Sequence, residues 1–196
     1  FILCICLMKE VLYDEVIMFF FKKKLSEIGA AMIFVLKINK WAAENDVAIK
    51  AAVQGVMLDN KCPLEQFKEH SDELYYATLA FLMQSIKNLF SAPQAQRLEN
   101  KIYETVKYIG NMSHLQMYLD AQKEYFDPIN AIPNKLIRRW LGEDIQLSAV
   151  NEMLMCMQVN YCFMPIIGYW KQVQKTYKLI ESDEKIEQLL RPIKDN

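Results

Sequence analysis

The sequence has few of the residues that build tight catalytic loops or carry out acid-base chemistry. It contains only 5 glycines and 2 histidines in 196 residues, whereas 53% of its residues are hydrophobic. It has no Gly-rich phosphate loop, no Gly-x-Ser-x-Gly turn and no His-Glu-x-x-His pair. The motifs of the common nucleotide-binding, hydrolase and metalloprotease classes are therefore missing, and we expect a protein that is not an enzyme.

Excess charge of either sign is also missing. The 23 basic and 24 acidic residues give a formal net charge of -1, and they are spread along the chain rather than gathered in blocks. General electrostatic attraction to nucleic acid requires a basic surface. We therefore expect no nucleic acid among the partners of this chain.

The cysteines do not have the spacing of a metal site or of a disulfide framework. There are five, an odd number, and none lies in a Cys-x-x-Cys pair: Cys4, Cys6, Cys62, Cys156 and Cys162. This pattern predicts reduced thiols and a cytoplasmic location. Of the metal-capable side chains at residues 69–73, only His70 and Glu73 would share a helix face, and we expect no metal or other cofactor.

Apolar residues recur at spacings of three and four, which predicts an all-α fold, a single-domain bundle of about six to eight helices. We expect the domain to span residues 18–196. Residues 1–17 would be an extension that is weakly ordered or not native, with Met18 as an alternative start. No segment alternates with a period of two and no hairpin dipeptide occurs, so no strand is expected.

Caps and breaks divide the predicted helices. The first covers residues 20–43, and Asn45 and Asp46 separate it from a short helix that ends near Asp59. A long amphipathic segment covers residues 64–90. Ser91 and Gln94 have the spacing of a capping box, which predicts the start of a helix over residues 92–126 with a break near Gly110.

Prolines mark the second half of the chain. Pro128 and Pro133 predict a connection, followed by a short helix over residues 134–141 that Gly142 ends. The last long helical segment, residues 145–180, should kink at Pro165, because the proline ring clashes with the preceding turn and removes one helical hydrogen bond. Ser182 would then begin a final short helix.

The segment around Pro165 is the predicted binding region. Residues 153–170 carry no charge and are rich in methionine, whose flexible thioether adapts to apolar partners or ligands. A buried bundle helix accounts for this composition better than a membrane span. We expect a cleft to open beside the kink, and its predicted residues are Met157, Tyr161, Phe163, Met164, Pro165 and Trp170.

Three functions fit this inventory. The leading hypothesis is a non-enzymatic interaction or regulatory protein, such as an adaptor, inhibitor or immunity protein, whose partner is another protein or a second copy of itself. The second is a sensor or carrier of an apolar small molecule or lipid with a cavity near Pro165. The third is a peripheral membrane protein held by three aromatic and three basic residues, Phe19, Phe20, Phe21, Lys22, Lys23 and Lys24.

Overall fold

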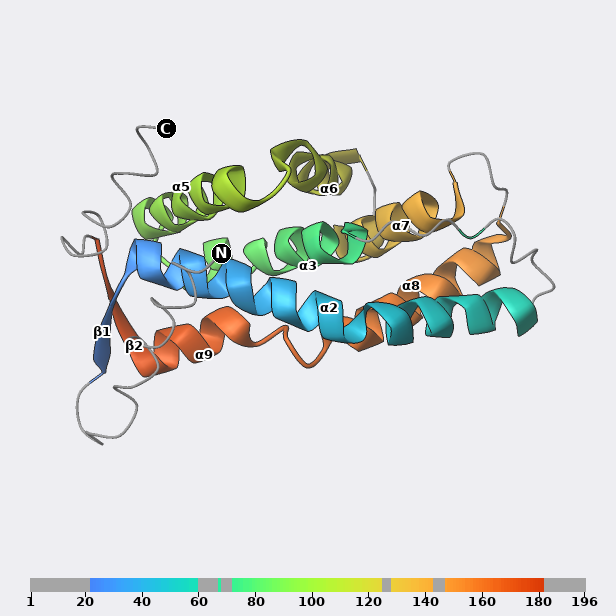
Figure 1. The fold of residues 1–196 in the computed structure, drawn as a ribbon, viewed down its shortest axis with the longest axis horizontal. Helices are drawn as coiled ribbons and strands as arrows, with labels where there is room; N and C mark the ends of the chain where they lie inside the picture. Colours follow the sequence, from blue (N-terminus) through green and yellow to red (C-terminus); the bar gives the residue numbers. More distant parts are fainter. Residues whose placement is uncertain (1–21, 60–66, 68–71, 125–127, 143–146, 182–196) are drawn as a thin grey trace.

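Helix α2 is the longest element of the bundle, and α3, α5 and α8 all pack against it (Figure 1). The computed structural model describes residues 22–59, 67, 72–124, 128–142 and 147–181. Within them the elements are β1 (Lys23–Ser26), α2 (Glu27–Asp59), α3 (Glu73–Met83), α4 (Ile86–Leu89), α5 (Ala92–Ile109), α6 (Met112–Glu124), α7 (Pro128–Leu141), α8 (Ala149–Phe163), α9 (Tyr169–Thr176) and β2 (Tyr177–Ile180). The predicted all-α fold class is confirmed.

The predicted break at Asn45 and Asp46 is wrong, because α2 continues through both residues. The Asn45 side-chain amide donates to the Trp41 carbonyl at 2.8 Å, and the Asp46 carboxylate pairs with Lys50 at 2.6 Å. Both side chains therefore bond one turn away along the same helix, and neither competes with the helical backbone for its hydrogen bonds. The predicted end at Asp59 is confirmed.

Helix α3 lies inside the bundle, where it contacts α2, α6 and α7. The sequence predicts an amphipathic helix here, yet every residue of α3 except Phe81 is buried. Thr78 is buried among them because its hydroxyl donates to the Leu74 carbonyl at 2.7 Å, which satisfies its hydrogen-bonding need within the helix. A helix that is enclosed on all sides does not need a polar face.

The start of α5 is confirmed, but its predicted capping box is not formed. Ser91 is the N-cap residue and makes no side-chain cap hydrogen bond, and the Gln94 amide donates instead to Glu27 at 3.4 Å. The break at Gly110 is confirmed, since α5 ends at Ile109 and α6 begins at Met112. There the Tyr76 hydroxyl accepts the Asn111 backbone N–H at 2.6 Å.

The predicted connection between Pro128 and Pro133 is wrong, because both prolines belong to α7. Pro128 is the first helical residue, where its missing N–H would have no helical partner in any case. Pro133 follows near the helix start, so the helix loses a single hydrogen bond. The predicted cap at Gly142 is confirmed: its φ is 103°, and its N–H donates to the Arg138 carbonyl at 2.7 Å.

At Pro165 the chain breaks rather than bends. Helix α8 ends at Phe163, residues 164–168 form turns, and α9 begins at Tyr169. The Tyr161 carbonyl accepts the Met164 N–H at 3.2 Å, and the Phe163 carbonyl accepts the Ile167 N–H at 3.1 Å. The first of these bonds gives the Tyr161 carbonyl a partner in place of the N–H that Pro165 lacks. The predicted interruption is thus confirmed, but it separates two helices instead of kinking one.

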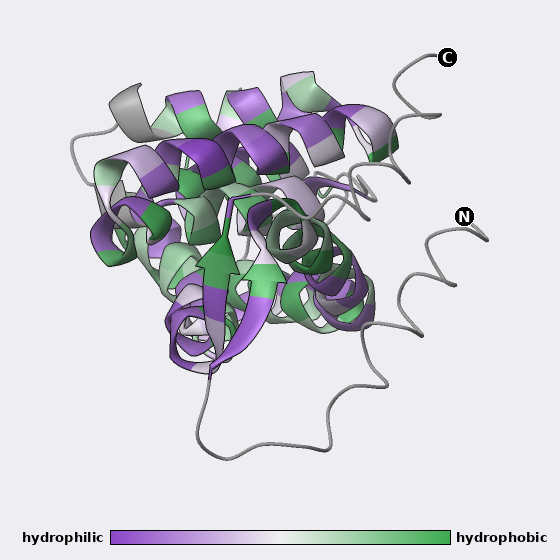
Figure 2. Ribbon diagram, turned by 90° about the vertical axis from the view of Figure 1, so that its left-hand side faces the viewer, coloured by the Kyte–Doolittle hydropathy of each residue, from purple (hydrophilic) through white to green (hydrophobic). Residues whose placement is uncertain are grey.

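A small parallel sheet contradicts the expectation that the chain has no strand. Strands β1 and β2 pair at one end of the bundle, with Leu25 opposite Leu179 (Figure 2). Four residues a strand are too few to produce a recognisable alternation. Several predictions fall outside the described residues. They concern the final helix from Ser182, the extension 1–17, the aromatic residues 19–21, and His70, Cys4, Cys6 and Cys62.

Candidate functional site

The outer face of α8 carries a row of exposed apolar side chains. The exposed fractions are 60% for Val150, 54% for Met153, 58% for Met157, 76% for Tyr161 and 59% for Met164. Spacings of three and four residues place Val150, Met153, Met157 and Tyr161 on one side of α8. Met164 is the C-cap residue just past the helix, and its helical backbone torsions (φ -52°, ψ -42°) continue the same row. We refer to these five side chains as the α8 stripe.

The opposite side of α8 holds the helix in the bundle. Met155, Cys156, Val159 and Phe163 are buried there, and the Phe163 ring centroid lies 4.8 Å from that of Phe81. Ser148 caps the helix start by accepting the Asn151 N–H at 3.2 Å. Helix α8 packs on α2 and α7 through this inner side. The same packing therefore fixes the α8 stripe toward solvent.

The α8 stripe carries no net charge. The only charged residue of α8 is Glu152, whose carboxylate accepts from Arg138 at 2.9 Å and also from the Asn134 amide. This carboxylate is already paired with α7, so α8 itself contributes no unpaired charge to the stripe. The face can therefore lose its water without separating an unpaired ion from solvent.

The structure does not bring the six predicted site residues into one lining. Met157, Tyr161, Met164 and Pro165 are exposed, whereas Phe163 and Trp170 are fully buried. The ring of Trp170 packs against Phe34 with centroids 4.7 Å apart. Phe163 and Trp170 are therefore core residues, while three of the exposed residues belong to the α8 stripe.

Sequence reasoning missed Val150 and Met153 as members of the site. Their signal was present, because they continue the spacing of Met157 and Tyr161 toward the N-terminus of α8. This spacing was an ambiguous signal, because Met155 lies between the exposed Met153 and Met157 and is itself buried. Methionine content alone does not separate a core face from an exposed face.

A second candidate is the buried polar cluster of Glu73, Tyr118 and Arg139. Glu73 accepts from two Arg139 nitrogens at 2.9 and 2.7 Å and from the Tyr118 hydroxyl at 2.5 Å. Burial alone would raise the pKa of Glu73, but these hydrogen bonds outweigh it and lower that pKa below its usual value. Burial, followed by the Glu73 carboxylate, raises the pKa of Tyr118 well above its usual value.

This cluster joins helices rather than presenting a reactive group. Glu73 is 1% exposed and its side chain is hydrogen-bonded on both oxygens, so no substrate atom could reach it. His114 lies beside Tyr76, and its Nδ1 is buried without a hydrogen-bond partner among the described residues. Burial also raises the pKa of the Cys162 thiol, which disfavours a nucleophilic thiolate. Within the described ranges, no group of three His, Cys, Asp or Glu side chains could hold a metal.

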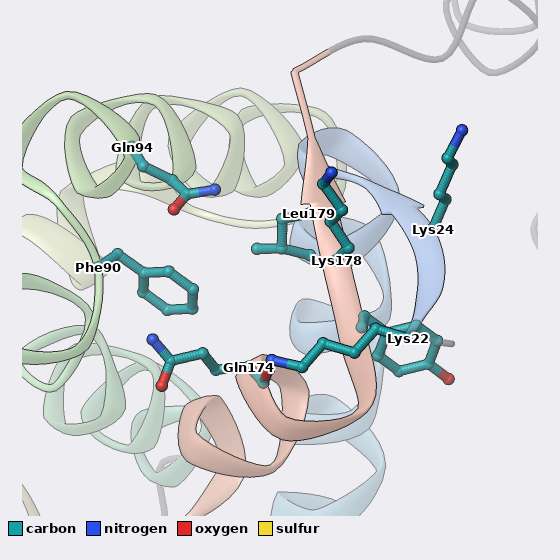
Figure 3. Close-up of a pocket in the computed structure, with 8 residues that line it drawn as sticks. Lys22, Lys24, Phe90, Gln94, Gln174, Lys178 and Leu179 are labelled. Carbon is teal, nitrogen blue, oxygen red and sulfur yellow. Dashed lines mark hydrogen bonds between the residues drawn. The ribbon is translucent and has the colours of Figure 1, made fainter. Parts of the chain in front are cut away.

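A third candidate is a pocket at the sheet end of the bundle, with a volume of about 720 Å³ (Figure 3). Its lining combines apolar and polar side chains, namely Lys22, Lys24, Phe90, Gln94, Gln174, Tyr177, Lys178 and Leu179. Gln174 is held there by two hydrogen bonds: its side-chain amide donates to the Leu89 carbonyl at 2.6 Å, and its backbone carbonyl accepts from the Lys22 ammonium at 2.9 Å. None of the six residues predicted around Pro165 lines this pocket, and a cavity beside Pro165 stays a prediction.

Comparison with known proteins gives no family for this chain. No protein-family model, curated protein or solved structure matches it. In the part of the chain that the structure describes, no helix is both long enough and apolar enough to span a membrane. The features of this chain that bear on its function are therefore the α8 stripe, the cluster around Glu73 and the pocket at the sheet end of the bundle.

Proposed function

We propose that this chain is a non-enzymatic interaction protein that binds another protein chain through the α8 stripe. The observation that carries the proposal is the exposure of five large apolar side chains on one helix face. Their combined exposed area is roughly 600 Å², which approaches the ~800 Å² that one partner contributes to a stable interface and reaches the upper range of patches on ordinary monomers.

The composition of the α8 stripe suits recognition of an apolar partner. Methionine side chains repack around different surfaces, and a tyrosine provides a large ring with a polar edge, the kind of residue that dominates binding energy at interfaces. Tyr161 is the most exposed of the five. A helix face of this kind fits an amphipathic helix or a shallow apolar groove on the partner.

Photo-crosslinking in cells that express the chain tests this proposal. Benzoylphenylalanine at Tyr161 should give a protein adduct that mass spectrometry identifies, and Met157→Lys in the same chain should abolish it. Tyr108 is the matched control, because it is an exposed tyrosine on α5, away from α8. If position 161 gives no adduct, or gives the same adducts as position 108, the α8 stripe is not a binding surface.

The pocket of Figure 3 favours a second candidate function, the binding of a small amphiphile. Phe90 and Leu179 would contact an apolar tail, while Lys178 would attract a carboxylate head group. Calorimetric titration with dodecanoate should show saturable binding that Lys178→Glu weakens. Lys107→Glu, a matched change at an exposed lysine of α5, should leave it unaltered. Equal binding by both variants would argue against the pocket.

Membrane association and a cytoplasmic location stay proposals. Lys22 and Lys24 are exposed at the sheet end of the bundle, where they could meet anionic lipid. Cys156 and Cys162 form no disulfide, which is compatible with a reducing compartment. Flotation with phosphatidylserine vesicles tests the first proposal, and a chain that stays at the bottom of the gradient would exclude it.

A further inference from the structure

The spacing within the α8 stripe is symmetric about its central residue. Met153 and Tyr161 lie four residues before and after Met157, and Val150 and Met164 lie seven residues before and after it. Residues separated by four or seven positions lie close to the same face of a helix. Reading the stripe in the reverse direction therefore gives the same pattern of apolar positions.

A symmetric stripe is complementary to its own reverse. When two such helices lie antiparallel, with a two-fold axis at Met157, that residue meets its own counterpart. Met153 then lies opposite Tyr161 of the second copy, and Val150 lies opposite Met164 of the second copy. Every position of the stripe finds an apolar partner, which is the condition for a closed two-fold interface.

We propose that the occupant of the α8 stripe is a second copy of this chain, packed antiparallel across α8 about a two-fold axis at Met157. This inference rests on the proposed function, since it assigns the partner of the same surface. The dimer would cover the stripe of each copy, and the two stripes would together reach roughly 1,200 Å², the lower end of the range for stable interfaces, if all of their exposed surface were buried.

The charges on α8 do not oppose self-association. In a two-fold interface each charge near the axis approaches its own counterpart, so a charged face repels itself. Here Glu152 is the only charged residue of α8, and Arg138 of the same chain neutralises it at 2.9 Å. Within α8, no unpaired charge would therefore approach its own counterpart across the two-fold axis.

Analytical ultracentrifugation of the full chain over a wide concentration range tests the dimer. The native chain should reach twice the mass of a single chain. Met157→Lys and Met157→Glu should each raise the dissociation constant at least 30-fold, roughly the effect of changing a central interface residue. An equimolar mixture of the two variants should dimerise again, because the lysine of one chain then faces the glutamate of the other.

A second pair of variants tests the register. Val150→Lys alone should weaken the dimer, and Val150→Lys combined with Met164→Glu in one chain should restore it, because residue 150 faces residue 164 of the second copy. Tyr108→Lys is the control for an exposed apolar residue on another helix, and it should leave the dissociation constant unchanged. Circular dichroism checks that each variant remains helical.

The outcomes separate this inference from the proposed function. A native chain that stays monomeric overturns the second copy as occupant, even if Tyr161 crosslinks to a different protein and so supports the proposed function. A monomeric chain without crosslinks overturns both. A dimer that tolerates Met157→Lys, or that the mixture of oppositely charged variants does not restore, overturns the antiparallel arrangement.

Discussion

The buried carboxylate of Glu73 should contribute strongly to the free energy of unfolding. It is 1% exposed and joins α3 to α6 through Tyr118 and to α7 through Arg139. Glu73→Gln keeps the size of the side chain but removes its charge, so that the hydrogen bonds from Arg139 and Tyr118 weaken. We expect a loss of about 2 kcal/mol, below the full cost of breaking a buried ion pair because the Arg139 side chain is 31% exposed to solvent.

The pH dependence of unfolding gives an independent check on this reasoning. The pKa of Glu73 is lower in the folded chain than its usual value of 4.5, so folding favours the ionised form. The stabilisation is therefore complete above the unfolded pKa and is lost as the pH falls through the lower, folded pKa. The difference between the native chain and Glu73→Gln should be constant near neutral pH and should shrink below about pH 4.5.

Urea denaturation followed by circular dichroism measures both effects. Glu44→Gln is the matched control, since Glu44 pairs with Lys40 at 3.7 Å on the exposed surface of α2. Exposed pairs of this kind contribute about 0 to 1 kcal/mol. The reasoning is refuted if Glu73→Gln and Glu44→Gln have equal effects, or if the Glu73→Gln difference is unchanged at acid pH.

Three further changes test other parts of the structure. Gly110→Ala should destabilise the fold by about 1 kcal/mol, because the new methyl group would lie 2.9 Å from the Tyr76 hydroxyl. Thermal unfolding should show a smaller loss of stability when the same change is made in a Tyr76→Phe background. An equal loss in both backgrounds would exclude this clash. Ser148→Ala should lower the free energy of unfolding by about 1 kcal/mol and Ser91→Ala by less than half of that, since of these two residues Ser148 alone makes a side-chain cap hydrogen bond. Equal denaturation midpoints for the two variants would show that this hydrogen bond does not contribute to stability. The helical circular dichroism signal should survive a strong chelator and a reducing agent, because the cysteines and histidines have no ligand spacing, and its loss would reveal a metal or a disulfide.

Local sequence signals predicted several helix ends correctly at glycine and proline, whose effect on the main chain does not depend on distant partners. Gly142 ends α7 with a φ of 103°, which favours glycine, and Pro165 separates two helices because it lacks a backbone N–H. Helix α5 ends before Gly110 as expected, where the absence of a side chain leaves room for the Tyr76 hydroxyl.

The local signals failed at Pro128 and Pro133, which α7 includes near its start, and where a side chain had a partner elsewhere. Gln94 bonds to Glu27 in preference to its own helix end, and no local pattern contains that pair.

The candidate site divides in the same way. The apolar character of α8 is visible in the sequence, and three of the predicted residues, Met157, Tyr161 and Met164, are exposed on it. Which side of a nearly uncharged helix faces solvent depends on how it packs against α2 and α7. The pairing of Glu73 with Arg139 spans 66 positions in the chain, so the sequence gives no local sign of it.

The parallel pairing of β1 and β2 determines how the molecule would respond to mechanical force. The chain enters β1 at Lys23 and leaves β2 at Ile180, at opposite ends of the two-stranded sheet. Tension applied to the two ends of the chain would therefore slide the strands past each other and load their hydrogen bonds together, instead of opening them one at a time. The four paired residues of each strand must therefore separate before the force reaches the helices between them.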